Sequence, residues 1–541
     1  MATWLTKWDP ENEQFWKNEG GSKHANRTLW ITTFSLIFSF ATWFVMSAVA
    51  VRLPAIGFQF DTMQLFWLAA MPGLAGGTFR LIHTFLIPIY GTRLVITIAT
   101  LLKIFPMLWL GFAVQNPETP FSHFLIIAIL CGFGGGDFSS YMPSTSIHFP
   151  KRLQGYAMGI QAGIGNFGVS LTQFVTPWII GFALFGAVGG GSQIFTKKSD
   201  VFDVKIAKDN GVVQNVEVKG ELANFISVTK NENGKVTDVI VSESDLTKGM
   251  KADVKKDDTG IVTDVTVKKV IQKNIWLQNA AFWYIPFLLI AAVLCWISLR
   301  SIRIEKPSVG GMVKNMTDNK HAWFCVITYF MTFGSFSGFS AAFPLMIKTI
   351  YGNIPGTDMA LAPDPLKYAF LGPLVGSLIR VIMGAPSDRM GGSIWIMVSG
   401  IGLMAGCVAL IFGGYLTPTS LDQFPMFVGI MLWIFLMAGI GNAATFRQYP
   451  IVFAFSPRQG AQILGWTGGI AAYGPFIFSA LIGAAITAYG NASVFFWGVL
   501  LFYCIATWIN WHYYTRKGAE RYDWGTKWGT WWDKAKNTWP K

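Results

Sequence analysis

Apolar residues are gathered in long runs that short polar segments separate. A helix that crosses a bilayer needs about 20 mostly apolar residues. Twelve runs have this character, at residues 30–50, 64–89, 94–114, 121–147, 155–188, 275–299, 323–347, 366–386, 394–415, 425–446, 463–488 and 492–514. The pattern predicts an all-α membrane protein with twelve transmembrane helices.

Composition supports a membrane protein and argues against several other classes. Of 541 residues, 52% are hydrophobic and only 13% are charged, whereas soluble domains carry about a quarter charged residues. This balance excludes a disordered chain and disfavours a soluble enzyme. The five cysteines all lie inside apolar runs, so neither a disulfide framework nor a CxxC metal site is predicted.

Positive charge is distributed unevenly between the two sides of the predicted membrane. The first 29 residues are polar and contain no signal-peptide core, so the amino terminus is expected to stay in the cytosol. With that orientation the inner loops carry Arg93, Lys151, Arg152, Arg300, Arg303, Lys306, Lys314, Lys320, Arg389 and Arg458. This asymmetry predicts a multi-pass protein of the cytoplasmic membrane with both termini inside. The net charge of +13 is therefore assigned to the membrane face, and no nucleic-acid partner is predicted.

The loop at 300–322 divides the helices six and six, which predicts two pseudo-symmetric bundles with a central site between them. The expected divisions are a cytoplasmic tail at 1–29, helices one to five at 30–194, an extracytoplasmic insert at 195–273, helix six at 274–299, a cytoplasmic linker at 300–322, helices seven to twelve at 323–515 and a Trp-rich cytoplasmic tail at 516–541. Five Trp alternate with Lys in that last tail. An amphipathic segment at the membrane surface is preferred there to a partner motif.

The insert interrupts the apolar pattern with 14 Lys and 13 acidic residues. One unit recurs within it, at 211–218, 234–241 and 260–267, each time as a Gly followed by alternating valines. Apolar residues of period two beside a Gly turn predict β-hairpins, and three repeats predict one small β domain of about six strands. A structural or lid role is preferred to ion binding, since no calcium-ligand run is present.

Four ionisable residues lie deep inside the predicted helices: Arg80, Lys103, Asp137 and Arg380. Such residues are costly in a bilayer and usually functional. Arg80 and Arg380 occupy similar depths in helices two and eight, which are equivalent in the two halves. Two facing guanidinium groups repel each other unless an anion lies between them, and each can donate bidentately to a planar oxyanion. The alternative is that each arginine pairs with a carbonyl or an acid for structure.

Several motifs occur in order along the chain and together indicate a family. They are the glycine-rich run at 162–170, the segment 132–142 with the following 149–155, and the segments 47–54 and 332–340. A loop motif G-x-x-x-D-R-x-G stands at 384–391. The set resembles the nitrate/nitrite porter family of the major facilitator superfamily over nearly all twelve helices, but the resemblance omits the insert.

The resemblance implies a set of substrate-binding residues at the matching positions. Arg80 and Arg380 match the two substrate arginines, and Asn166 and Tyr329 match side chains that hydrogen-bond the anion. Phe138 and Phe333 resemble aromatics that sandwich it, with Phe40 a weaker match. The remaining matches are glycines of the two signatures, Gly163, Gly165 and Gly465, and the inner-gate pair Asp388 and Arg389 of the loop motif.

Two departures from the family pattern change the interpretation. The second signature, at 464–474, lacks the usual hydroxyl near Gly468, which weakens a direct contact from that helix. Asp137 replaces an expected Asn, and Lys103 replaces an apolar residue. The two could form a buried ion pair, or Asp137 could be a protonatable site that couples uptake to protons.

The sequence therefore predicts a transporter that moves nitrate and/or nitrite by alternating access, with exchange of the two anions preferred. Proton-coupled nitrate symport, transport of another small anion, and an anion sensor that uses the insert remain alternatives. A monomer without cofactor or metal is expected. No enzyme is predicted, because the six histidines are scattered without ligand spacing.

Overall fold

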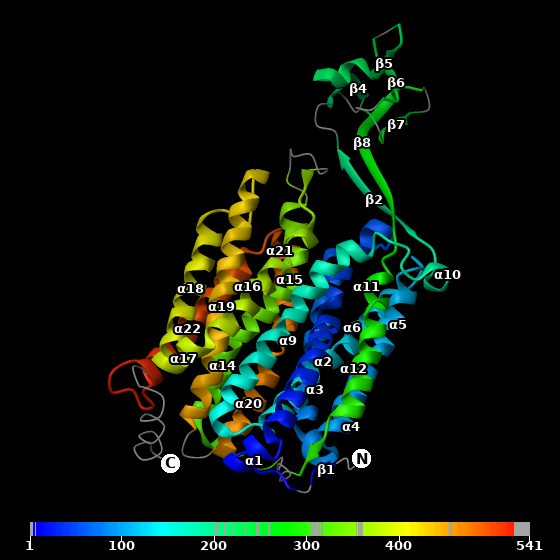
Figure 1. The fold of residues 1–541 in the computed structure, drawn as a ribbon. Coiled ribbons are helices and arrows are strands. Elements are labelled where there is room, and N and C mark those ends of the chain that lie inside the picture. The colour runs from blue at the N-terminus through cyan, green and yellow to red at the C-terminus, as the bar shows by residue number, and fades with distance from the viewer. Residues whose placement is uncertain are drawn as a thin grey trace.

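Long helices run side by side in the computed structural model, and a β-stranded arm extends from one end of them (Figure 1). The structure describes residues 4–523 except 6, 201–203, 210–211, 219, 233, 245–246, 248, 258–259, 304–309, 311–313, 315–316, 353, 355–360 and 454–456. The two described chain ends lie at the end of the molecule opposite the arm. We call these the terminal end and the insert end.

The first bundle is built from the helices before the linker. They are α2 (Gly21–Val49), α3 (Thr62–Tyr90), α4 (Thr92–Leu102), α5 (Ile104–Ala113), α6 (Phe121–Cys131), α7 (Phe133–Gly136), α8 (Phe138–Ser146), α9 (Lys151–Ile179), α11 (Asn279–Phe282) and α12 (Tyr284–Ser298). Lys103 lies at the break between α4 and α5, and Asp137 at the break between α7 and α8. Lys103 and Asp137 therefore each lie where a helix is interrupted.

The second bundle follows the linker. It contains α14 (Lys320–Tyr329), the π-helical turn η3 (Phe330–Gly334), α15 (Ser335–Tyr351), α16 (Leu371–Ile382), α17 (Gly384–Met390), α18 (Gly392–Phe412), α19 (Phe424–Val452), α20 (Pro457–Ala471), α21 (Gly474–Tyr489), α22 (Ser493–Asn510) and the π-helical turn η7 (Trp511–Thr515). The π turn η3 widens the helix at Phe333, and such turns are frequent at functional sites.

The prediction of an all-helical membrane fold in two bundles is confirmed. In the described part of the chain, eleven helical segments are long and apolar enough to cross a membrane. The fifth predicted span is α9, a helix of 29 residues whose apolar pattern is interrupted by Gln161, Asn166 and Gln173. It ends at Ile179 rather than at 188, and the short helix α10 (Gly186–Gly189) follows. The reason is Pro177 in its last turn and the Gly-rich stretch beyond.

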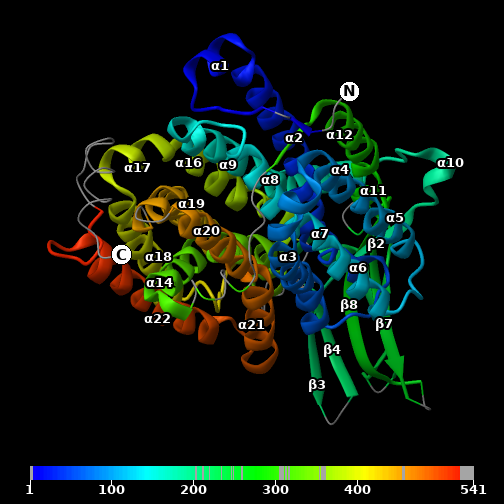
Figure 2. The same ribbon diagram turned by 90° about the horizontal axis from the view of Figure 1, so that it is seen from below.

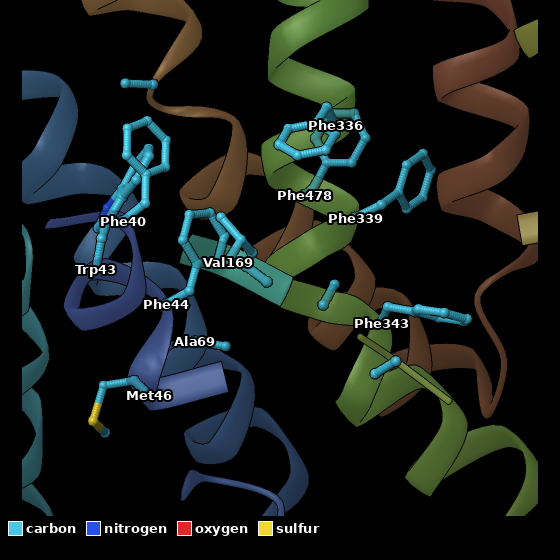
Figure 3. Close-up of a cluster of buried hydrophobic side chains, with 14 of the residues drawn as sticks. Phe40, Trp43, Phe44, Met46, Ala69, Val169, Phe336, Phe339, Phe343 and Phe478 are labelled. Atoms are coloured by element: carbon cyan, nitrogen blue, oxygen red, sulfur yellow. The ribbon is translucent and has the colours of Figure 1, made fainter. Parts of the chain in front are cut away.

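The two bundles meet along α3 with α20 and α21, and along α9 with α16 (Figure 2). Small residues allow the close approach. A Cβ on Gly73 would lie 2.5 Å from the backbone N of Phe476, and one on Gly163 would lie 2.4 Å from Val381 Cγ2. Figure 3 shows the aromatic residues in the buried core, with Phe40, Trp43 and Phe44 of α2 facing the phenylalanines of α15.

The insert is an arm of antiparallel strands. They are β2 (Gln193–Asp200), β3 (Val204–Asp209), β4 (Val212–Val218), β5 (Ile226–Lys230), β6 (Val236–Val241), β7 (Met250–Lys256) and β8 (Val262–Ile275). Strand pairs β3–β4, β5–β6 and β7–β8 are hairpins, and β8 also pairs with β2 in a three-stranded sheet of order β2-β8-β7. Each sequence repeat supplies the second strand of one hairpin.

The repeated valines form the core of the arm. Val213 and Val216, and their counterparts Val236, Val239, Val262 and Val265, are at most 6% exposed and pack together. Gly234 and Gly260 turn two of the hairpins with φ of +76° and +79°, a conformation that glycine adopts without steric cost. The two buried valines of each repeat are three residues apart, and a β-bulge between them in each hairpin brings both to the inner face.

The terminal end is closed by short elements around the bundles. Strand β1 (Trp4–Leu5) pairs in parallel with β9 (Ser301–Ile302), which joins the amino-terminal segment to the end of α12. Helix α1 (Glu13–Asn18) packs Trp16 against Phe149. The segment after η7 returns along the second bundle as far as Asp523. The five tail Trp lie at 524–541, outside the described residues, so the surface-helix prediction falls outside them too.

Candidate functional site

Two buried arginines lie between the bundles, one from each half of the chain. Arg80 of α3 is fully buried, and Arg380 of α16 is 3% exposed. Small residues precede each of them on the helix face that meets a neighbour. A Cβ on Gly76 would lie 2.8 Å from Trp43, and one on Gly376 would lie 2.7 Å from Phe336. The close packing that these glycines permit brings both guanidinium groups into the interior.

Arg80 is held by two backbone carbonyls on opposite sides of the bundle interface. Its Nε donates to the carbonyl oxygen of Gly135 at 2.8 Å, and its Nη1 donates to that of Gly468 at 2.7 Å. Gly135 belongs to α7 of the first bundle and Gly468 to α20 of the second. The third nitrogen, Nη2, has no partner in the described structure. One donor of a fixed guanidinium is thus left available.

Arg380 is less constrained. Neither of its Nη nitrogens makes a hydrogen bond of good geometry among the described residues, and its guanidinium carbon lies 4.9 Å from the ring centre of Phe446. No acidic side chain of the described chain forms an ion pair with Arg380 within 4.0 Å. A charged group that is buried without a partner costs several kcal/mol, so this arrangement favours a ligand that supplies acceptors.

Aromatic rings surround the arginines. The guanidinium carbon of Arg80 lies 4.5 Å from the ring centre of Phe138 and 5.1 Å from that of Phe333. Phe333 stacks on Tyr329, with ring centres 5.4 Å apart and planes 10° apart. Tyr329 interacts electrostatically with both arginines, and its hydroxyl interacts directly with the guanidinium of Arg380. These rings link the two arginines through one continuous aromatic wall.

Phe40 lies one layer behind this wall. Its ring meets that of Phe138 edge to face at 5.8 Å, and it also contacts Trp43. It therefore supports Phe138 from behind. The structure shows no contact of Phe40 with either guanidinium.

Asn166 of α9 is fully buried, and neither its amide nitrogen nor its oxygen has a partner in the described structure. An unsatisfied carboxamide in an apolar interior is expensive, which makes it a candidate to contact a ligand or water. The signature glycines beside it serve helix packing. Gly163 faces Val381 of α16, and Gly165 faces Leu36 of α2, 2.6 Å from its built Cβ.

Gly465, the glycine chosen from the second signature, does not reach Arg80. A Cβ on Gly465 would lie 3.5 Å from Cγ2 of Thr84. The residue that touches Arg80 is Gly468, through its carbonyl oxygen. The missing side-chain hydroxyl predicts a weaker contact between this helix and the anion site. In the structure, the helix contacts Arg80 through a backbone carbonyl oxygen, which needs no hydroxyl.

Lys103 and Asp137 form a buried ion pair beside the arginine site. Lys103 Nζ lies 2.5 Å from Asp137 Oδ2, and Ser39 Oγ donates to the same oxygen at 2.9 Å. Both side chains are at most 1% exposed. Asp137 also interacts electrostatically with Arg80, but its nearest cation is Lys103. Because the pair is neutral as a whole, the positive charge of the two arginines remains uncompensated.

The loop motif predicted a gate at the terminal end, and the structure places a different ion pair there. Arg389 is exposed and the side chain of Asp388 lies outside the described residues. Asp523 instead accepts from the backbone N–H of Gly392 at 3.0 Å and from Arg447 Nη1 at 3.3 Å. The returning carboxyl-terminal segment therefore caps the N-terminus of α18, where a carboxylate is favoured.

Sequence reasoning missed two contributions to the site. Phe446 packs on Arg380 and meets Tyr329 edge to face at 5.7 Å. The predicted helix at 425–446 contains several aromatic residues, so its sequence does not single out Phe446. The carbonyls of Gly135 and Gly468 leave no signal in the sequence. Among the described residues, no three His, Cys, Asp or Glu side chains gather as metal ligands.

The arrangement can bind a small anion. It offers three Nη donors that make no hydrogen bond of good geometry in the described structure, beside the Tyr329 hydroxyl and flat aromatic rings. Asp137, the acid that interacts with Arg80, is already paired with Lys103. Donors without acceptors and cations without counterions in a buried site require a negatively charged ligand.

Comparison with known proteins shows that the chain is similar to membrane transporters. No family model matches the chain. It is 48% identical over 520 residues to the probable nitrate/nitrite antiporter NarK2 of Thermus thermophilus, which covers 96% of this chain and 98% of that protein. It is 32% identical over 533 residues to the nitrate/nitrite transporter NarU of Escherichia coli (strain K12), covering 95% and 96%.

A solved structure shows the same fold at much lower sequence similarity. The nucleoside transporter NupG superposes with a TM-score of 0.53 and 9% identity, over 89% of this chain and 98% of that chain. At this identity the likeness concerns the arrangement of helices alone. It agrees with a transporter made of two bundles.

Proposed function

Because the chain belongs to the nitrate/nitrite porter family of the major facilitator superfamily, we propose that it exchanges nitrate and nitrite across the cytoplasmic membrane by alternating access. The relatives that establish the family are named as antiporters or transporters of these two anions. One observation carries the proposal within this chain. Arg80 and Arg380 are buried between the bundles and together have three Nη donors that make no hydrogen bond of good geometry in the described structure.

The anion resolves an electrostatic conflict between the two arginines. Arg80 and Arg380 repel each other across a medium of low dielectric. A flat oxyanion between them accepts from both guanidinium groups and turns the repulsion into two attractions. Nitrate and nitrite are planar and carry one charge, so they fit between Phe138 and Phe333, and Tyr329 and Asn166 supply further hydrogen bonds.

Exchange follows from the same conflict. Without a bound anion, closure of the bundles brings two uncompensated positive charges together, so the empty transporter resists the change between its two faces. A bound anion removes this barrier, and the bundles can rock about it. Nitrate entering and nitrite leaving then use the same transition in opposite directions.

Two features support exchange over proton symport. Asp137, the candidate proton site, already has a partner within the first bundle, because its Oδ2 lies 2.5 Å from Lys103 Nζ. Exchange of two anions of equal charge also needs no other ion to balance it.

A monomer is sufficient, because one chain supplies both arginines. The distribution of basic loops supports an orientation with both termini in the cytosol and the insert outside.

Reconstitution in liposomes tests the proposal. Liposomes loaded with nitrite are placed in labelled nitrate, and uptake and membrane current are recorded together. We expect uptake only when nitrite or nitrate is present inside, with no net current. Uptake into empty liposomes with an inward current would show symport. Competition by formate or sulfate as strong as competition by nitrite would show a porter of another anion.

A further inference from the structure

The first strand of the insert touches both bundles at the insert end. The ring of Phe195 in β2 lies 5.5 Å from the guanidinium carbon of Arg52, which follows α2 of the first bundle. Two residues further along the strand, Lys197 Nζ donates to the carbonyl oxygen of Ala362 at 3.3 Å. Ala362 lies in the segment before α16, in the second bundle. The arm therefore spans the junction between the two halves.

Beneath this strand an ion pair joins the bundles. Arg52 Nη2 lies 2.8 Å from Oδ1 and 2.7 Å from Oδ2 of Asp364. Asp364 also accepts from the backbone N–H of Leu366 at 3.2 Å and so caps the short helix η5 (Pro365–Lys367) that leads into α16. Arg52 is 8% exposed, and Phe195 covers one face of it.

Further hydrogen bonds cross between the bundles in the same half of the molecule. Lys348 Nζ donates to the carbonyl of Val51 at 2.9 Å. Gln173 Nε2 donates to that of Ser340 at 2.8 Å, and Ser170 Oγ to that of Phe370 at 3.0 Å. All of these bonds must break when the insert end opens. Together with the Arg52–Asp364 pair they form a closed gate at this end.

The base of the arm is anchored to the first bundle by hydrogen bonds, which hold β2 in a fixed position beside the gate. The backbone N–H of Leu277 donates to Gln193 Oε1 at 2.9 Å, and that of Trp276 donates to the carbonyl of Ile180 at 2.7 Å. Strand β2 pairs with β8 over its whole length, from Gln193 to Asp200. The base of the arm thus belongs to the first bundle, and among the described residues Lys197 of the arm contacts the second bundle at Ala362.

We propose that the insert is a brace of the gate at the insert end and thereby sets the balance between the two faces of the transporter. Phe195 shields the Arg52–Asp364 pair from water, which strengthens the attraction between the two charges. Lys197 holds the segment that carries Asp364. The proposal rests on the alternating access of the proposed function, but it assigns the insert a role in transport rather than in sensing.

The test measures how often the gate opens, without using any substrate. A reporter cysteine replaces Ser340, a fully buried residue at the closed interface, in full-length protein that carries Cys504→Ser to remove the one exposed cysteine among the described residues. A membrane-impermeant maleimide is applied from the insert side in liposomes. Phe195→Ala and Asp364→Asn are compared with Ile240→Ala, a control on β6 whose side chain is 53% exposed.

We expect Phe195→Ala to raise the labelling rate about two- to fivefold, the range that a partly buried cation–π contact corresponds to. Asp364→Asn should raise it further, and Ile240→Ala should leave it unchanged. In the Asp364→Asn background, Phe195→Ala should add little, because the pair that it shields is already broken. Equal labelling in the parent and in both gate variants would overturn the proposal.

The outcome separates this inference from the proposed function. Labelling of Cys at position 340 does not depend on the identity of the anion. If the gate variants label faster but the parent protein fails to exchange nitrate for nitrite, the brace stands and the substrate assignment falls. If the parent exchanges the two anions but the variants label like the control, exchange stands and the brace falls.

Discussion

The guanidinium of Arg80 donates to the carbonyl oxygen of Gly468 across the interface between the two bundles, at 2.7 Å. The same group is fixed to its own bundle through Gly135. Arg80 is therefore both a ligand for the anion and a link between the halves that must move. A movement of Arg80 therefore couples anion binding to the relative position of the two bundles.

Replacing this guanidinium by an ammonium should largely abolish exchange. Lysine keeps the charge but cannot reach Gly135, Gly468 and an anion at once. Each lost hydrogen bond to a charged group is worth about 1.5–3 kcal/mol. We expect Arg80→Lys and Arg380→Lys to lower the rate of nitrate/nitrite exchange in liposomes by about ten- to a hundredfold. Arg303→Lys is the control, since that side chain is exposed and has no role in the site. Exchange within twofold of the parent in Arg80→Lys would refute the need for a guanidinium at this position.

The Lys103–Asp137 pair should behave as a structural unit. Removing one partner leaves a buried charge alone and costs about 3–5 kcal/mol, whereas removing both costs much less. We expect large drops in Tm for Lys103→Met and Asp137→Asn separately, and a smaller drop for the double variant than the sum. The exposed pair Lys208–Asp264 in the insert is the matched control, where neither substitution should matter.

The same variants decide the role of Asp137 in proton coupling. Where the purified Asp137→Asn protein stays folded in liposomes, its exchange rate should depend on external pH as the parent's does. A proton dependence that is present in the parent and lost in the variant would instead make Asp137 the coupling site.

Gly163 should be intolerant of even one methyl group. A Cβ there lies 2.4 Å from Val381 Cγ2 on the facing bundle, and overpacking of this kind costs about 1–3 kcal/mol. We expect Gly163→Ala to slow exchange severalfold, and Val381→Ala in the same protein to restore it. Gly159→Ala, on the same helix with nothing within 4 Å of its Cβ, should be neutral. Failure of the Val381→Ala rescue would place the defect elsewhere.

The docked carboxyl-terminal segment should make stability depend on pH. Burial raises the pKa of Asp523 from 3.8 to about 6, although Arg447 and the N–H groups of Gly392 and Ser393 pull it down. The folded protein thus holds this proton more tightly than the unfolded chain does. Asp523 contributes stability below pH 4 that is lost as the pH rises through about 6, an effect of about 3 kcal/mol at most.

Thermal unfolding in detergent between pH 4 and pH 7.5 checks this sign. The Tm of the parent should fall with rising pH relative to that of Asp523→Asn. Asp422→Asn changes an acid outside the buried cluster, in the short helix η6 (Leu421–Gln423), and should follow the parent. A parent curve parallel to that of Asp523→Asn would contradict the burial of a titrating group there.

The sequence by itself determined the spans, the division into two halves, the hairpins of the insert and the choice of Arg80 and Arg380. These features depend on local patterns: apolar runs set by the thickness of the bilayer, valines of period two, and charges that are too costly to bury without a purpose. Phe138, Phe333 and Tyr329 were found through motif resemblance, and the structure brings them together with Arg80.

Only the tertiary structure decided which groups meet. A carbonyl oxygen has the same chemistry at every residue, so nothing in the sequence distinguishes Gly468 from Gly465 as the partner of Arg80. Phe446 and Phe412 are equally apolar, and the rotation of their helices decides that one packs on Arg380 while the other is 73% exposed. The return of Asp523 to α18 and the contact of Phe195 with Arg52 join residues more than a hundred positions apart in the sequence. Such contacts depend on the packing of complete bundles, which local patterns do not encode.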